Sequence, residues 1–108
     1  MATLEDKIFD ALAIRDTANY FSTITDNIQY NIKTILIQNG LNQILTCQLQ
    51  GAREDTFTDV YNVGNSFTVN ANTNDYQPMT NYFPYLRLKV SSTTPTTGTL
   101  TAYLERAR

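Results

Sequence analysis

From Tyr20 onward, apolar and polar side chains alternate with a period of two along much of the chain. The alternation is clearest in the stretches 85–90 and 99–105. Successive side chains of an extended strand point to opposite faces, so this pattern places one face against a core and the other against solvent. The apolar positions of the two stretches are Leu86, Leu88, Val90, Leu100, Ala102 and Leu104. The pattern therefore predicts half-buried β-strands.

These alternating stretches are short, are separated by turn residues, and are rich in Thr, Tyr, Phe, Val and Ile, which suit pleated, half-buried surfaces. We expect strands at 20–25, 30–38, 43–50, 57–63, 67–71, 85–90 and 99–105, and a loop at 72–78. About seven short antiparallel strands predict an all-β fold, a small antiparallel β-sandwich with jelly-roll-like topology. A closed barrel is the main alternative.

Two hairpins are predicted within this fold. The dipeptide 39–40, Asn-Gly, is a strong hairpin signal because both residues tolerate positive φ, and a three-residue loop there sets Ile35 opposite Leu45. Near the C-terminus, pairing Leu86 with Leu104 puts the apolar residues of both stretches on one face. Both hairpins would join strands that are neighbours in one sheet.

The N-terminal segment has a different pattern. Leu4, Ile8 and Leu12 recur every four residues, the spacing of one helix face, and the segment carries most of the charge of the first half. We therefore predict a short N-terminal helix or arm at 1–18 and a β-sandwich domain at 19–108. The three apolar residues are candidate docking residues, either on their own domain or on a neighbouring subunit.

Composition excludes several kinds of chemistry. The chain has no His, so a His-containing catalytic triad, a His-ligated metal site and a histidine pH switch are all impossible. Its single cysteine, Cys47, lies in an alternating stretch and is expected to be a buried apolar residue. We expect no enzyme activity, no cofactor and no metal site. The acidic balance and the absence of long apolar runs argue against nucleic-acid and membrane partners.

Aromatic residues are the remaining functional candidates. Tyr76, Tyr82 and Tyr85 are close together in the sequence, near Phe83. Such rings can form a stacking platform for a sugar, with Asn, Gln and Asp side chains as hydrogen-bonding neighbours. They can equally line a subunit interface, where Tyr is enriched, and the absence of Trp weakens the sugar hypothesis.

The C-terminal segments resemble the last hairpin of small β-sandwich virion proteins of tailed bacteriophages. The resemblance rests on 82–90, Tyr-Phe-Pro-Tyr-Leu-Arg-Leu-Lys-Val, and on 98–104, Gly-Thr-Leu-Thr-Ala-Tyr-Leu, with a Thr/Ser-rich loop between them. It implies a structural role without catalytic residues, as a capsid decoration or as a head or tail accessory protein. The implied partners are further copies of the chain and capsid or tail proteins.

This hypothesis agrees with the composition. Charged residues are only 17% of the chain, whereas Thr, Asn, Gln and Ser together contribute 38 of the 108 residues, so side-by-side packing would desolvate few ions. The N-terminus lacks the basic start and apolar run of a signal peptide, so we expect the chain to be made and assembled in the host cytoplasm. The resemblance to virion proteins implies a location in the virion. The alternative function is a non-catalytic carbohydrate- or surface-binding module.

Overall fold

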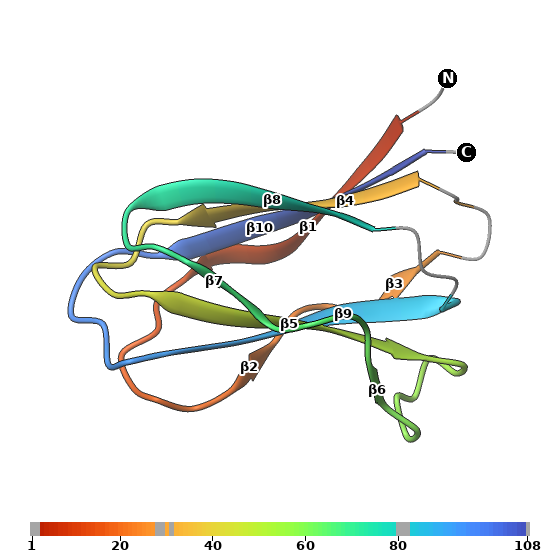
Figure 1. The fold of residues 1–108 in the computed structure, drawn as a ribbon, viewed down its shortest axis with the longest axis horizontal. Helices are drawn as coiled ribbons and strands as arrows, with labels where there is room; N and C mark the ends of the chain where they lie inside the picture. The colour runs from red at the N-terminus through yellow and green to blue at the C-terminus, as the bar shows by residue number, and fades with distance from the viewer. Residues whose placement is uncertain (1–2, 28–29, 31, 80–82, 108) are drawn as a thin grey trace.

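The computed structural model describes residues 3–27, 30, 32–79 and 83–107. Within these ranges the chain forms β-strands in two antiparallel sheets and no helix, which confirms the predicted all-β sandwich (Figure 1). The strands of the first sheet, called sheet A, are in spatial order β1 (Thr3–Leu12), β10 (Leu100–Ala107), β4 (Ile32–Asn39) and β8 (Thr73–Met79). Sheet B contains β2 (Tyr20–Phe21), β3 (Thr25–Asp26), β9 (Tyr85–Ser92), β5 (Leu45–Ala52), β6 (Tyr61–Asn62) and β7 (Phe67–Val69).

The strand order is that of a jelly roll. Both β2 and β3 pair with β9, and both β6 and β7 pair with β5, so each of these pairs acts as one interrupted edge strand. When β2 with β3 and β6 with β7 are each counted as one strand, the described part of the chain has eight strands. Their spatial order is 1-8-3-6 in sheet A and 2-7-4-5 in sheet B. This order arises when a long antiparallel hairpin rolls up into two packed sheets. The jelly-roll-like prediction is therefore confirmed.

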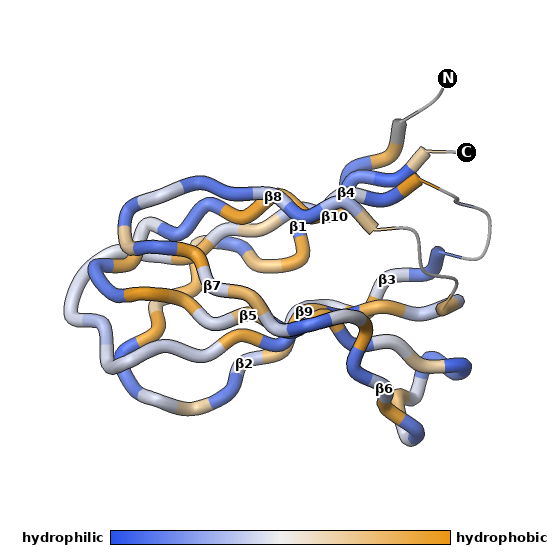
Figure 2. The backbone as a smooth tube through the Cα atoms, in the orientation of Figure 1, coloured by the Kyte–Doolittle hydropathy of each residue, from blue (hydrophilic) through white to orange (hydrophobic). Residues whose placement is uncertain are grey.

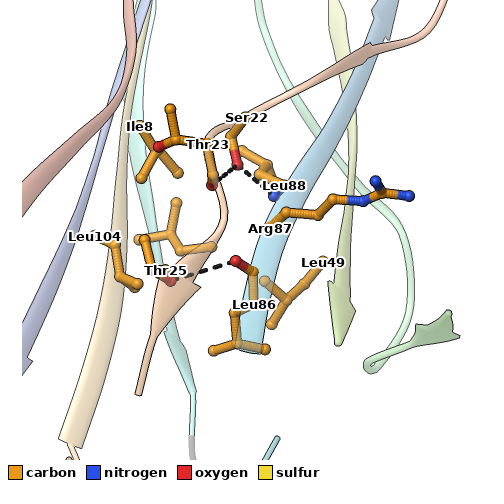
Figure 3. A pocket seen from close by; sticks show the side chains of 10 residues that line it. Ile8, Ser22, Thr23, Thr25, Leu49, Leu86, Arg87, Leu88 and Leu104 are labelled. Carbon is orange, nitrogen blue, oxygen red and sulfur yellow. Dashed lines mark hydrogen bonds between the residues drawn. The ribbon is translucent and has the colours of Figure 1, made fainter. Parts of the chain in front are cut away.

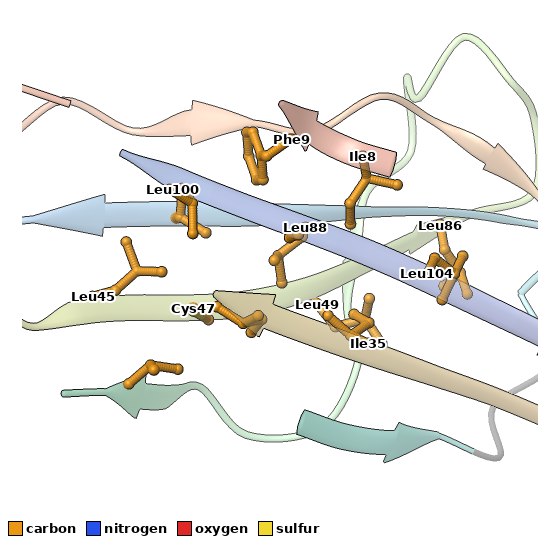
Figure 4. Packing of buried hydrophobic residues seen from close by; sticks show 14 of the residues in the cluster. Ile8, Phe9, Ile35, Leu45, Cys47, Leu49, Leu86, Leu88, Leu100 and Leu104 are labelled. Atoms are coloured by element: carbon orange, nitrogen blue, oxygen red, sulfur yellow. The ribbon is translucent and has the colours of Figure 1, made fainter. Parts of the chain in front are cut away.

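The core lies between the two sheets and follows from the alternation. Figure 2 shows apolar and polar positions alternating along the strands, and Figure 4 shows the apolar side chains of both sheets meeting in the interior. The central residues are Ile35, Ile37, Leu45, Cys47, Leu86, Leu88, Val90, Leu100, Ala102 and Leu104, all buried. Each large one contributes about 1.5–3 kcal/mol by leaving water, which makes this shared interior the main source of stability.

The predicted N-terminal helix is wrong. The segment is β1, an edge strand that pairs antiparallel with β10. Its register shifts between Lys7 and Phe9 and again between Phe9 and Leu12. At the first irregularity the consecutive residues Ile8 and Phe9 are both buried, 5% and 6% exposed. A bulge of this kind interrupts the period of two, so the apolar spacing of β1 imitates a helix face although the backbone is extended.

Both predicted hairpins are also wrong in their pairing. Leu86 pairs with Gly51 in sheet B, whereas Leu104 pairs with Ile35 in sheet A, so β9 and β10 lie in different sheets. The same holds for β4 and β5, where Leu45 pairs with Ser92 and not with Ile35. The loops after β4 and β9 cross from one sheet to the other. Alternation determines which side chains are buried, but two strands that face each other across a core show the same pattern as two that are hydrogen-bonded.

Two further segments differ from the prediction for related reasons. The stretch 72–78, expected as a loop, is largely β8, a polar edge strand that pairs with β4 over its whole length. The stretch 57–63, expected as a strand, contains only the two residues of β6. Propensity is a weak guide at sheet edges, where the neighbouring strand supplies the hydrogen bonds.

Candidate functional site

The outer face of sheet A carries a continuous row of side chains across its four strands. In register, Lys7 of β1 lies beside Tyr103 of β10, which lies beside Leu36 of β4, which lies beside Tyr76 of β8. The Lys7 ammonium lies 5.8 Å from the centre of the Tyr103 ring, within the range of a cation–π contact. Cross-strand neighbours of this kind pack together, so the row forms one surface of aromatic and apolar groups on a polar face.

A groove of about 270 Å³ lies at the β4–β8 side of this row. Its lining residues are Leu36, Ile37, Gln38, Asn74, Asp75 and Tyr76. The Tyr76 side chain is 62% exposed, and Leu36 is half-buried beside it. The groove thus combines an open aromatic ring, two amides and a carboxylate on two neighbouring strands.

The free edge of β8 is poorly suited to adding another strand. The backbone N–H of Tyr76 donates to Oδ1 of Asp75 at 2.8 Å, so this donor is already used on the edge side. Backbone groups of an edge strand point alternately toward and away from the sheet, so Pro78 occupies the same side as Tyr76, and proline has no N–H. Two successive outward positions of β8 therefore offer no free donor to an incoming strand.

The outer face of sheet B is partly covered by the chain itself. The guanidinium of Arg87 lies 4.3 Å from the centre of the Phe21 ring and 4.4 Å from that of Phe57, and its Nε donates to Oε1 of Gln50 at 2.9 Å. Phe57 belongs to the loop between β5 and β6 and is buried on this face. Burial lowers the pKa of Arg87. These contacts hold the loop against sheet B and leave sheet A as the more open face.

The end of the sandwich near the chain termini holds a buried cation. Arg106 donates to the Asp6 carboxylate and to the backbone carbonyl of Asp26, and its guanidinium lies 4.9 Å from the centre of the Tyr30 ring. Position 106 continues the inward-facing side of β10, which explains its burial. Charged groups at the end of a core remain stable there when they are paired and hydrogen-bonded in this way.

The space between the sheets offers no room for a ligand on the side of β1 and β3. The cavity there is about 10 Å³, at the lower limit for a single water molecule (Figure 3). Its polar groups are satisfied locally: the Leu88 N–H donates to Ser22 Oγ at 2.8 Å, and the Thr25 hydroxyl donates to the Leu86 carbonyl at 3.3 Å. This cavity is therefore a small gap in the packing of the core and not a ligand site.

The predicted docking residues of the N-terminal segment have different positions in the fold. Leu4 is 42% exposed near the end of sheet A. Ile8 is a core residue, and Leu12 is partly buried against the core. Of the three side chains, Leu4 is therefore the one that is open to a partner.

The predicted aromatic cluster is divided by the fold. Tyr76 lies on the outer face of sheet A, whereas Tyr85 is half-buried on β9 of sheet B, and Phe83 packs against the core over Gly51. Tyr82 lies outside the described residues. The groove partners of Tyr76 are instead Gln38, a polar position of β4, and Asn74, which lies two residues before it on β8. Their presence could be read from the sequence, but their proximity requires the β4–β8 register.

The part of the chain that the structure describes contains no group of three or more His, Cys, Asp or Glu side chains arranged to hold a metal ion. Within the same residues, no helix is long and apolar enough to cross a membrane.

The sequence matches no protein-family model and no curated protein. Among solved structures, the fold is similar to that of the PBSX exported protein XepA, with a TM-score of 0.76, 9% sequence identity and 96% of this chain covered. It is also similar to a structure of infectious bursal disease virus, Gx strain, with a TM-score of 0.53, 10% identity and 97% of the chain covered. The chain spans 37% of the first of these proteins and 31% of the second. These similarities show a shared fold.

Proposed function

We propose that this protein is a structural component of a tailed-phage virion, a capsid decoration or head or tail accessory protein that acts by self-association and by docking on capsid or tail proteins. The observation that carries this proposal is the jelly roll shared with a protein of the phage PBSX over nearly the whole chain. The similarity to a virus structure with the same kind of fold supports it. Since fold alone does not determine function, the surface must supply the contacts.

The end of the sandwich near the termini is the surface we propose for self-association. Leu4 of β1 and Ile32 of β4 are 42% and 52% exposed there, although both are large apolar residues. The strand between them is β10, and their pairing partners on it, Arg106 and Ala107, are consecutive, so the two side chains lie at the same end of sheet A but on opposite faces. Large apolar side chains exposed on both faces at one end of a sheet offer that end as a contact surface for another molecule.

Oligomeric state tests this part of the proposal. We expect the full chain to sediment as a stable oligomer, and we expect Leu4→Asp and Ile32→Asp to sediment as monomers, because a charge in an apolar contact must be desolvated. Ile44→Asp is the matched control. Ile44 is 39% exposed and lies directly before β5, near the end of β4 that is opposite to Ile32. Far-ultraviolet circular dichroism would confirm that all three variants are folded. A wild-type protein that remains monomeric at high concentration would contradict self-association.

Virion location needs a separate experiment. An antibody to this protein should label particles purified from cells that produce the phage, and mass spectrometry of those particles should detect it in a fixed ratio to the major capsid protein. Particles without the protein, from cells that express it, would overturn the proposal. Truncation of residues 1–16 is unsuitable for either test because it removes β1 from sheet A.

A further inference from the structure

We propose that the groove on the outer face of sheet A, formed by the side chains of Leu36, Gln38, Asn74 and Tyr76 with Asp75 at its edge, binds a neutral saccharide. The proposal concerns a ligand site of the folded domain and does not depend on a virion location.

The register of β4 and β8 builds the groove. Leu36 pairs with Tyr76, and Gln38 pairs with Asn74. The two pairs are two residues apart on each strand, so all four side chains point to the same face. The exposed Tyr76 ring beside the half-buried Leu36 gives an apolar wall. The C–H face of a sugar ring packs on an aromatic ring of this kind.

The polar groups of the groove are free to bind. Among the described residues, neither the Gln38 nor the Asn74 side chain has a hydrogen-bond partner, and both residues are exposed. Each amide offers both donors and an acceptor, which is the combination that a sugar hydroxyl requires. One oxygen of Asp75 accepts from the Tyr76 N–H, and the carboxylate retains further acceptor capacity.

The charge and shape of the groove select the class of ligand. Its lining residues include no cation, and the Asp75 carboxylate lies at the edge of β8 beside the groove, so an anionic sugar, a phosphate or an acidic peptide would find no positive charge to pair with. A peptide that adds as a further strand is disfavoured because the Tyr76 N–H is already used and Pro78 has no N–H. The groove volume of about 270 Å³ is slightly below the usual range of small-molecule pockets, about 300–1,000 Å³, so the groove suits a small ligand.

Binding to an array of neutral and anionic oligosaccharides tests the proposal, followed by titration of the strongest neutral oligosaccharide into isotopically labelled full-length protein. We expect neutral glycans to bind and amide shifts to be confined to residues 34–38 and 73–77. Tyr76→Ala should weaken binding about tenfold, equivalent to about 1.4 kcal/mol, whereas Tyr76→Phe should retain it. Gln38→Ala should weaken binding as well.

Tyr61→Ala is the matched control, since Tyr61 is an exposed tyrosine on a short edge strand of the other sheet. It should leave affinity unchanged, and amide spectra would show that every variant is folded. The proposal is overturned by an array without neutral glycan binding, by preference for anionic glycans, by shifts outside the groove, or by equal affinities of Tyr76→Ala and the wild-type protein.

Discussion

Arg106 and Asp6, separated by 100 residues in the sequence, form an ion pair between the neighbouring strands β10 and β1. The Arg106 side chain is almost completely buried, whereas the Asp6 side chain is partly open to solvent. The pair attaches the edge strand to the rest of sheet A at the end where Leu4 is exposed. Strand β1 is thus held by charge at one end and by the burial of Ile8 and Phe9 further along.

Asp6→Ala should destabilise the protein by about 3 kcal/mol, because it leaves the buried guanidinium without its counter-charge. Urea unfolding followed by circular dichroism measures the change. Asp10→Ala is the control on the same strand: Asp10 pairs with Lys7 at 3.6 Å at the surface, and such pairs contribute about 0–1 kcal/mol. Equal losses in the two variants would show that the Arg106 pair is not a stabilising contact.

Gly98→Ala should destabilise the protein by more than about 2 kcal/mol. Gly98 has a φ of +88°, which is strained for any residue with a Cβ, and an added Cβ would lie 1.8 Å from the Gly40 carbonyl oxygen. Gly64→Ala separates backbone strain from the steric clash, since Gly64 has a φ of +71° but open space around it. This variant should therefore lose only about 1–2 kcal/mol of the free energy of unfolding. Thermal unfolding of both variants gives the comparison, and a smaller loss for Gly98→Ala would contradict it.

The Cys47 thiol should be unreactive in the folded protein. Burial, aided by the negative charge of Asp75, raises its pKa from 9.0 to about 12. A thiol reagent at pH 8 should therefore modify it only after unfolding, since the thiolate is the reactive form. Rapid modification of the native protein would argue against a buried position.

The same pKa shift predicts a pH dependence of stability. The folded state holds the thiol proton more tightly than the unfolded state, so this contribution is fully present below about pH 9 and is lost as the pH rises toward about 12. Cys47→Val removes the titrating group, so the free energy of unfolding of this variant should fall less over that range than that of the wild-type protein. Parallel curves would contradict the assignment.

Arg87→Lys should loosen the loop between β5 and β6. Lysine keeps the charge but cannot stack its planar group between Phe21 and Phe57 or reproduce the Nε hydrogen bond to Gln50. We expect faster proteolysis at 53–60 and a loss of about 1–2 kcal/mol. Lys89→Ala, at the next outward position of β9, should change neither the rate of proteolysis nor the stability. Similar cleavage of the two variants would show that any change on the outer face of sheet B loosens the loop.

Asn39 illustrates how a local turn signal led to a wrong connection, since neither Asn39 nor Gly40 has the positive φ of a tight hairpin turn. The Asn39-Gly40 pair does mark a chain reversal, but the Asn39 side chain is buried and donates to the backbone carbonyls of Gln43, Val69 and Asn70. It holds together the corner at which the chain leaves sheet A for sheet B. Turn propensity describes the local backbone and carries no information about the sheet that receives the next strand.

The candidate groove likewise contains one residue that the sequence singled out and neighbours that only strand pairing reveals. Tyr76 was identifiable as an exposed aromatic residue in a polar stretch, but its predicted neighbour Tyr85 is in the other sheet. Its actual neighbours, Leu36 and Gln38, precede it by about 40 residues. Sequence proximity placed the tyrosines together, whereas only strand pairing determines which side chains share a face.

By itself, the sequence determined the fold class, most of the core and the absence of imidazole chemistry, because burial on one face of a strand requires a period of two that is visible without a partner. Only the tertiary structure decided the strand nature of β1, the crossing of the chain between sheets after β4 and β9, and the groove beside Tyr76. These features depend on backbone hydrogen bonds between distant segments, and every residue type can form such bonds, proline through its carbonyl alone.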